Sequence, residues 1–236
     1  MPLEAATAEG ATRGRMMESH LEGEAEGARA TVPAPWIRLA LDVGEKAFVV
    51  FLFSWLAWSV FAAVGKGATW LNFLQLASEA LNAAFILLRA RASIVSYRAS
   101  DWLVSIGATT GSLLARPGDV PSLVPAFAGA LILVGLACQI WAKLALRRSF
   151  GLAPANRGLK VKGPYRYVRH PMYLGYLTGW IGFFLLNPTL WNLGVYGVTI
   201  FCQVLRIEAE ERVLATDPGH GAYRAEVPYR VIPGVW

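Results

Sequence analysis

The feature that most constrains this chain is a succession of apolar runs separated by polar loops. The runs lie near residues 47–65, 70–88, 102–115, 122–142, 172–186 and 189–205. The first, second and fourth are about as long as the 20 residues that a helix needs to cross a bilayer core. Hydrophobic residues make up 55% of the chain and charged residues 16%, whereas a soluble domain averages about 25% charged. A soluble globular protein is therefore excluded, and an all-α integral membrane protein is indicated.

Basic residues gather in two of the loops, which gives the expected orientation. The first loop holds Arg89, Arg91 and Arg98, and the second holds Lys143, Arg147, Arg148, Arg157, Lys160, Lys162, Arg166 and Arg169 without an acidic residue. Positive loops collect on the cytoplasmic side, and both loops share that side only if run 102–115 crosses the membrane. We therefore expect about six transmembrane helices (five is the alternative) in the inner or plasma membrane, with both termini cytoplasmic.

Three regions of different character divide the chain. Residues 1–35 are rich in Ala, Gly and Glu and are expected to be a disordered tail. Residues 36–145 hold the N-terminal transmembrane helices, and residues 146–236 hold the segments in which chemistry concentrates. The last two apolar runs are separated only by Asn187 and Pro188, which predicts a tight helical hairpin followed by a C-terminal cytoplasmic helix.

Common soluble-enzyme and metal motifs are missing from the sequence. There is no Walker loop, no HExxH and no GxSxG, and no strand-associated GxGxxG of a Rossmann domain. Cys138 and Cys202 each lie inside an apolar run, without a disulfide framework or zinc spacing. We expect no metal.

The segment GPYRYVRHPMYLGYLTG, residues 163–179, is the first candidate site. Proline is well tolerated at the start of a helix, so Pro171 is expected at an early helical position. His170 then lies at the helix N-terminus, where backbone amides and the helix dipole favour an anion. An interfacial belt of aromatic and basic side chains is the alternative, and sequence physics leaves the two open. Gly175 and Gly179 have GxxxG spacing, which favours close helix packing.

The segment RIEAEERVL, which follows the sixth apolar run, is the second candidate. Arg206 and Glu210 are four residues apart and share one helix face, whereas Glu208 and Glu211 are expected to point elsewhere. A solvated continuation of the helix is the alternative, and it suits Glu208 and Arg212 better than Arg206 and Glu210.

A polar stripe inside the second run is the third candidate. Asn72, Gln75, Glu79 and Asn82 recur at spacings of three, four and three, which places them on one face of a helix. An ionisable residue within a membrane segment is a functional-site hypothesis, so Glu79 is a minor candidate for substrate binding. Polar contact between helices is the favoured interpretation of the stripe.

The two motifs together, GPYRYVRHPMYLG and then RIEAEERVL, resemble the isoprenylcysteine carboxyl methyltransferase family and its bacterial relatives. The related phospholipid N-methyltransferases share this C-terminal architecture. The resemblance covers roughly residues 150–236, and the tail YRAEVPYRVIPGVW also fits it. It implies a membrane methyltransferase that uses S-adenosyl-L-methionine without a Rossmann domain, so that residues 146–236 would be its cofactor-binding core. The cofactor site is then expected on the cytoplasmic side.

The resemblance also implies roles for single residues, carried over by matching position. Arg206 would be the catalytic residue that faces the methyl acceptor. The cofactor pocket would include Leu159, Lys160, Tyr165, His170, Pro171, Met172, Tyr173 and Glu210. The family often has His-x-Leu-Val before the GxY element, whereas this chain has Arg157-Gly158-Leu159-Lys160, which keeps the Leu and lacks the His.

These roles agree with the chemistry of the side chains. His170 and nearby amides suit the cofactor carboxylate, Glu210 can accept hydrogen bonds from ribose hydroxyls or the amino group, and Tyr165 and Tyr173 offer flat apolar faces. Arg206 could hold a carboxylate acceptor through two hydrogen bonds.

The leading hypothesis is methyl transfer to a lipophilic acceptor, with a carboxylate favoured over a phospholipid amine or a small thiol. Two alternatives belong to other classes. One is an NADPH-dependent membrane reductase of the sterol-reductase type, and the other is a non-catalytic transport or assembly protein that uses the stripe around Glu79. The expected partners are the bilayer and a lipophilic or lipid substrate, with no nucleic acid; the oligomeric state is left open.

Overall fold

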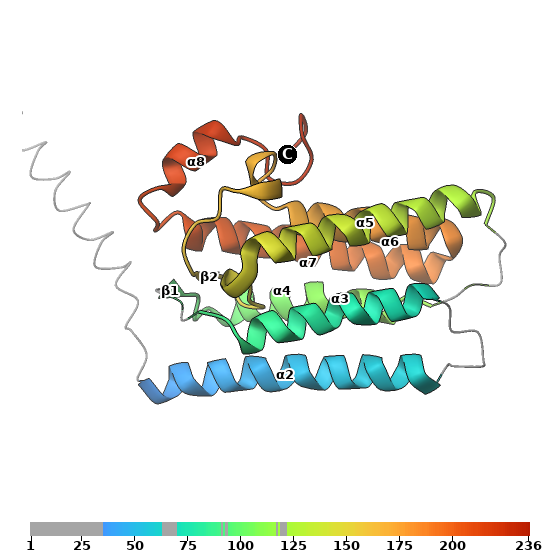
Figure 1. Ribbon diagram of the computed structural model, residues 1–236, viewed down its shortest axis with the longest axis horizontal. Coiled ribbons are helices and arrows are strands. Elements are labelled where there is room, and N and C mark those ends of the chain that lie inside the picture. Colours follow the sequence, from blue (N-terminus) through green and yellow to red (C-terminus); the bar gives the residue numbers. More distant parts are fainter. Residues whose placement is uncertain (1–34, 63–69, 91, 93, 117, 119–121) are drawn as a thin grey trace, which may run out of the picture. The chain divides into compact units, whose positions relative to one another are not determined.

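Helices make up most of the described structure (Figure 1). The computed structural model describes residues 35–62, 70–90, 92, 94–116, 118 and 122–236. The chain divides into two units, Met1–Gly44 and Glu45–Trp236. The described part of the first unit is the beginning of helix α2 (Pro35–Ala62). The tail expected over residues 1–35 therefore lies outside the described residues, apart from Pro35.

The second unit contains the remainder of α2 and the elements that follow it. Its other helices are α3 (Trp70–Leu87), α4 (Ala99–Thr110), α5 (Pro125–Leu146), α6 (Pro171–Leu186), α7 (Leu190–Leu214) and α8 (His220–Glu226). Short 3₁₀ helices cover Gly111–Leu114, Arg147–Ser149 and Gly163–Arg166, and the two-residue strands β1 (Ile94–Val95) and β2 (Ala155–Asn156) pair antiparallel. The expectation of a mainly α-helical protein is confirmed.

Two of the described helices, α5 and α7, are long and apolar enough to cross a membrane, and α6 is a shorter apolar helix. The run expected over 102–115 falls in α4 and the 3₁₀ helix after it. At 1.5 Å per residue α4 is about 18 Å long, which is less than the roughly 30 Å of a bilayer core. The structure is consistent with an all-α membrane protein, whereas the six-span topology stays a prediction.

Helices α5 and α6 pack closely because small residues face each other across their contact. A Cβ atom on Gly175 would lie 2.7 Å from the carbonyl oxygen of Gly135, and a Cβ on Gly182 would lie 2.6 Å from that of Ala128. Such distances leave room only for glycine. The close packing predicted from the GxxxG spacing is thus found at Gly175, with α5 as the partner.

Local sequence determines where α6 and α7 begin. Pro171 is the first residue of α6 and His170 is its N-cap, as expected. Leu186 ends α6, and α7 begins only at Leu190, after Thr189 has capped it by accepting a hydrogen bond from the amide of Asn192 at 3.1 Å. Figure 1 shows α5, α6 and α7 running side by side.

The polar stripe expected on the second apolar run falls in α3. The side chains of Asn72, Gln75, Glu79 and Asn82 lie outside the described part of the structure. The substrate-binding role considered for Glu79 therefore stays a prediction.

Hydrogen bonds from the C-terminal segment and α8 fix the chain at the start of α6. The amide of Arg169 donates to the carbonyl of Tyr229 at 3.0 Å, and the amide of His170 donates to that of Arg230 at 2.7 Å. The Tyr223 hydroxyl on α8 donates to the carbonyl of Tyr165 at 2.7 Å. These bonds hold the first candidate motif against the segment that follows α7.

Candidate functional site

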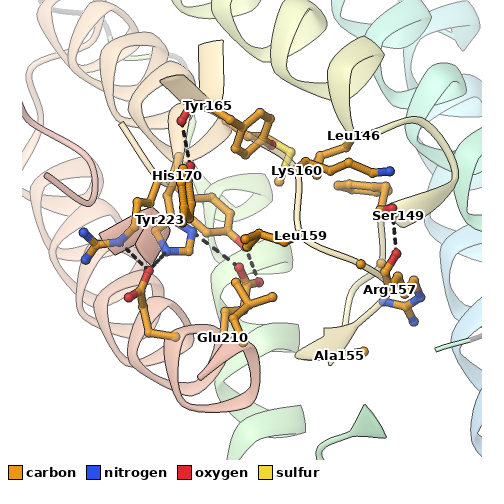
Figure 2. Close-up of a pocket in the computed structure, with 18 of the residues that line it drawn as sticks. Leu146, Ser149, Ala155, Arg157, Leu159, Lys160, Tyr165, His170, Glu210 and Tyr223 are labelled. Carbon is orange, nitrogen blue, oxygen red and sulfur yellow. Dashed lines mark hydrogen bonds and ion pairs between the residues drawn. The ribbon is translucent and has the colours of Figure 1, made fainter. Parts of the chain in front are cut away.

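A pocket of about 780 Å³, counting the part that is open to solvent, lies where α5 and α7 end and α6 begins. Figure 2 shows Ser149, Arg157 and Lys160 on one side of it and Tyr165 and His170 on the other. Seven of the eight residues proposed from sequence to bind a cofactor line this pocket: Leu159, Lys160, Tyr165, His170, Met172, Tyr173 and Glu210. The eighth, Pro171, is fully buried and does not line it.

One wall of the pocket is a loop whose turn depends on glycine. Gly158 has φ +87°, in the left-handed region, and its amide donates to the Oδ1 atom of Asn156 at 2.9 Å. The turn places Leu159 and Lys160 at the pocket, and the Ser149 hydroxyl fixes it further by donating to the carbonyl of Arg157 at 3.1 Å. Gly158 in Arg157-Gly158-Leu159-Lys160 is therefore favoured because this turn needs a left-handed backbone conformation.

His170 lies between two carboxylates of α7. Its Nε2 atom is 2.8 Å from Oε1 of Glu211, and its Nδ1 atom is 3.6 Å from Oε2 of Glu210. The ring also stacks on Tyr173 with centroids 5.6 Å apart, and the Tyr173 hydroxyl donates to Glu210. His170 and Glu210, predicted separately from two motifs, thus meet in one pocket.

Glu211 is the main site residue that sequence reasoning missed. We expected it to point to another side of the helix than Arg206 and Glu210, and we gave it no role, but it is buried and lines the pocket. Its Oε1 atom accepts from Nε of Arg169 at 2.9 Å and contacts His170. Arg169 also donates to the carbonyls of Val227 and Pro228. Because Glu211 binds His170, the N-cap of α6, and Arg169 before it, it holds the start of that helix against α7.

His220, on α8, approaches Glu211 from the other side. Its Nε2 atom is 3.7 Å from Oε2 of Glu211, and the side chain is 3% exposed. Burial lowers the pKa of His220 below its ordinary value, although the charge of Glu211 acts in the opposite direction. Burial likewise raises the pKa of Tyr165 well above its ordinary value, and the charge of Glu210 adds to this. Tyr165 therefore presents a neutral phenol to the pocket.

Arg206 lies beside the pocket, with its guanidinium 5.3 Å from the centre of the Tyr173 ring. Its Nε atom donates to Glu210 at 3.2 Å and its Nη1 atom to the Thr109 hydroxyl at 3.2 Å. Its Nη2 atom donates to the carbonyls of Gly151 and Leu152 at 3.3 and 3.0 Å. Among the described contacts these use four of the five guanidinium hydrogens, so one hydrogen on Nη1 is available for a ligand.

The loop that binds Arg206 is held from outside the two motifs. The Glu45 carboxylate accepts from the amide of Leu152 at 2.7 Å and forms a buried ion pair with Arg89. Neither Glu45 nor its partner carried a recognisable motif, so only the folded structure connects them to Arg206.

Arg206 also lines a second, larger cavity, which we call the apolar cavity. It measures about 2230 Å³ with its open part included, and Phe150 lines both it and the pocket. Its lining includes Leu52, Phe53, Leu56, Ile132, Leu136, Trp180 and Phe183. Among the described residues that line it, Arg206 is the charged one, so a cation lies at the wall of an otherwise mainly apolar space.

The remaining acidic and basic residues of the second motif have structural partners. Glu208 pairs with Arg230 at 2.8 Å, with its side chain 46% exposed. Arg212 pairs with Asp101 of α4 at 2.8 Å. The expectation that these two residues are not part of the site agrees with their absence from the pocket lining.

Comparison with known proteins bears on the activity. Residues 123–217 match the family model described as phospholipid methyltransferase. The protein is a methyltransferase. The matched segment contains α5, α6 and α7, and hence most of the pocket. Together with the two long apolar helices, the match supports a place in the membrane. A comparison with curated proteins found no match.

Proposed function

We propose that this methyltransferase binds S-adenosyl-L-methionine in the pocket and transfers its methyl group to the carboxylate of a lipophilic acceptor in the apolar cavity. The observation that carries the proposal is the position of Arg206. It bonds to the pocket residue Glu210 and lines the apolar cavity. A carboxylate bound to this guanidinium would lie at the boundary between the two spaces.

The residues of the pocket fit the cofactor by their chemistry. Glu210, with 20% of its side chain exposed, can accept hydrogen bonds from an amino group or ribose hydroxyls. Lys160 supplies positive charge for a carboxylate, and Tyr165 and Tyr173 supply flat faces for adenine.

The chain's own residues would act mainly by positioning. The cofactor supplies a methyl group on a sulfonium, which is already activated toward in-line displacement. Arg206 would hold the attacking carboxylate through its available Nη1 hydrogen, and a second hydrogen bond would require the Thr109 contact to be given up. The buried pocket wall around Tyr173 and Met172 would limit water near the transferring group.

A phospholipid amine is the second candidate acceptor, because the matched family model carries that description. The charge of Arg206 favours a carboxylate over it, since a cationic headgroup would be repelled by a buried guanidinium. We further propose that the pocket faces the cytoplasm, because the basic loop that forms its wall follows the positive-inside rule.

The deciding experiment uses purified protein in detergent with methyl-labelled S-adenosylmethionine. The acceptors offered are a long-chain carboxylic acid, a phosphatidylethanolamine and a lipophilic thiol. Treatment of the product with base should release the label as methanol, which identifies an ester. Retained label would contradict the carboxylate assignment in favour of an amine or thioether.

Cofactor binding is tested separately by calorimetry. Glu210→Ala should weaken S-adenosylmethionine binding roughly 10- to 100-fold, from about 1.5–3 kcal/mol for a hydrogen bond to a charged group. Glu208→Ala is the matched control, since Glu208 lies on the same helix and pairs with Arg230 away from the pocket. Binding of NADPH in place of S-adenosylmethionine would contradict the proposed cofactor, as would equal losses in the two variants.

A further inference from the structure

An ion pair joins the pocket to the apolar cavity. Among the described lining residues, Glu210 belongs to the pocket alone, and Arg206 belongs to the apolar cavity alone. The Oε1 atom of Glu210 accepts a hydrogen bond from Nε of Arg206 at 3.2 Å. The two proposed ligands, cofactor and acceptor, would therefore each contact one member of the same ion pair.

Glu210 supplies negative charge to Arg206 before any ligand binds. The Arg206 side chain is 4% exposed, and a buried guanidinium needs a compensating charge. Its other described hydrogen-bond partners carry no net charge, and they are the Thr109 hydroxyl and the carbonyls of Gly151 and Leu152. The Glu210 carboxylate thus weakens the attraction between Arg206 and any carboxylate in the cavity.

The Glu210 carboxylate is also open to the pocket. Its side chain is 20% exposed, and its Oε1 atom also accepts from the Tyr173 hydroxyl. Its Oε2 atom is 3.6 Å from Nδ1 of His170. Hydrogen-bond donors of a bound cofactor, above all its cationic amino group, would share this carboxylate with Arg206. A carboxylate that serves a second cation compensates the first one less.

We propose that Glu210 couples the two sites, so that cofactor bound at Glu210 strengthens the binding of an acceptor carboxylate at Arg206. This inference rests on the proposed function, in which those two ligands occupy the pocket and the apolar cavity. Coupling between binding sites is reciprocal, so the acceptor carboxylate strengthens cofactor binding by the same factor. Glu210 thus favours the complex that holds both ligands over the complexes that hold one.

The experiment measures equilibrium binding of a labelled long-chain fatty acid to the full chain in detergent, with and without S-adenosylhomocysteine. This demethylated form of the cofactor keeps the amino group and the ribose and has no methyl group to transfer. It should tighten binding of the acid to the unmodified protein roughly 5- to 20-fold, in the lower part of the range for coupled sites. Equal or weaker binding of the acid in its presence would overturn the inference.

Two variants test whether Glu210 is the coupling residue. In Glu210→Gln the amide oxygen can still accept from Arg206 but carries no charge. The acid alone should therefore bind this variant roughly 5- to 20-fold more tightly than the unmodified protein, and saturating S-adenosylhomocysteine should add nothing. Weaker binding of the acid to Glu210→Gln would show that Glu210 only positions Arg206, and the inference would fail. Glu208→Gln is the matched control, since Glu208 lies on the same helix and pairs with Arg230; it should keep both the affinity and the coupling.

A neutral ligand tests the same point without a variant. A labelled long-chain alcohol of the same length has no charge for Arg206 to attract, so S-adenosylhomocysteine should leave its affinity unchanged. An equal gain for the acid and the alcohol would mean that the cofactor acts on the shape of the cavity rather than on its charge. That result would overturn the inference even if Glu210→Gln does not fold.

Failure of this inference is distinguishable from failure of the proposed function. Arg206→Ala should lower the affinity for the acid with and without S-adenosylhomocysteine. If it does not, or if the unmodified protein binds no acid, the proposed acceptor site is wrong and the coupling is wrong with it. If it does, and S-adenosylhomocysteine leaves the affinity of the unmodified protein for the acid unchanged, only the coupling is wrong.

Discussion

The buried carboxylate of Glu211 makes the clearest stability prediction. Its side chain is 6% exposed, and those of its partners Arg169 and His170 are 4% and 5% exposed. Replacing Glu211 by Gln removes the negative charge and leaves the Arg169 guanidinium buried without a counter-charge. Breaking a buried pair in this way costs about 3–5 kcal/mol, a large share of the roughly 5–15 kcal/mol that stabilises a typical protein.

The Gln variant should fall near the lower end of that range. Its amide oxygen can still accept from Nε of Arg169, so about 3 kcal/mol is expected for Gln and up to about 5 kcal/mol for Ala. The assay is denaturant unfolding in detergent, followed by the fluorescence of the nine tryptophans. The loss should appear with and without S-adenosylmethionine, because it comes from the protein's own contacts.

Glu208→Gln is the control for this measurement. Glu208 lies on the same helix and also pairs with an arginine, but its side chain is 46% exposed, so its loss should cost no more than about 1 kcal/mol. If Glu211→Gln costs no more than this control, the charge of Glu211 does not hold the start of α6 in place, and our account of the pocket wall fails.

Three further predictions follow from single residues. Gly158→Ala should cost about 1–2 kcal/mol because φ +87° strains a Cβ residue, whereas Gly221→Ala, in helix α8 with open space around it, should not destabilise the fold. The pKa of His220 is lowered, so its neutral form is favoured in the folded state. The free energy of unfolding should therefore fall as pH drops below about 6.5. A His220→Asn variant should lose less of this free energy over the same pH range. Glu45→Ala should raise the KM for the acceptor, because Glu45 holds the loop whose carbonyls bind Arg206. The affinity for S-adenosylmethionine, measured by calorimetry, should stay the same. A matching loss of cofactor affinity would contradict this prediction.

The sequence by itself determined the class of protein and the two motifs of the pocket. Apolar runs and basic loops indicated helices in a membrane, and these depend only on local composition. Proline chemistry correctly placed Pro171 at the start of α6 with His170 as its cap. Helical spacing correctly paired Arg206 with Glu210, since residues four apart meet on one face.

Tertiary structure alone decided which neighbours these residues have. Glu211 follows Glu210 in the chain and so points to another side of α7, and nothing local showed that Arg169 and His170 would be there. Glu45 has no motif, because its importance comes from what a distant loop brings against it. Spacing along one helix can be read from its period, whereas contacts between segments far apart in sequence depend on how the helices pack.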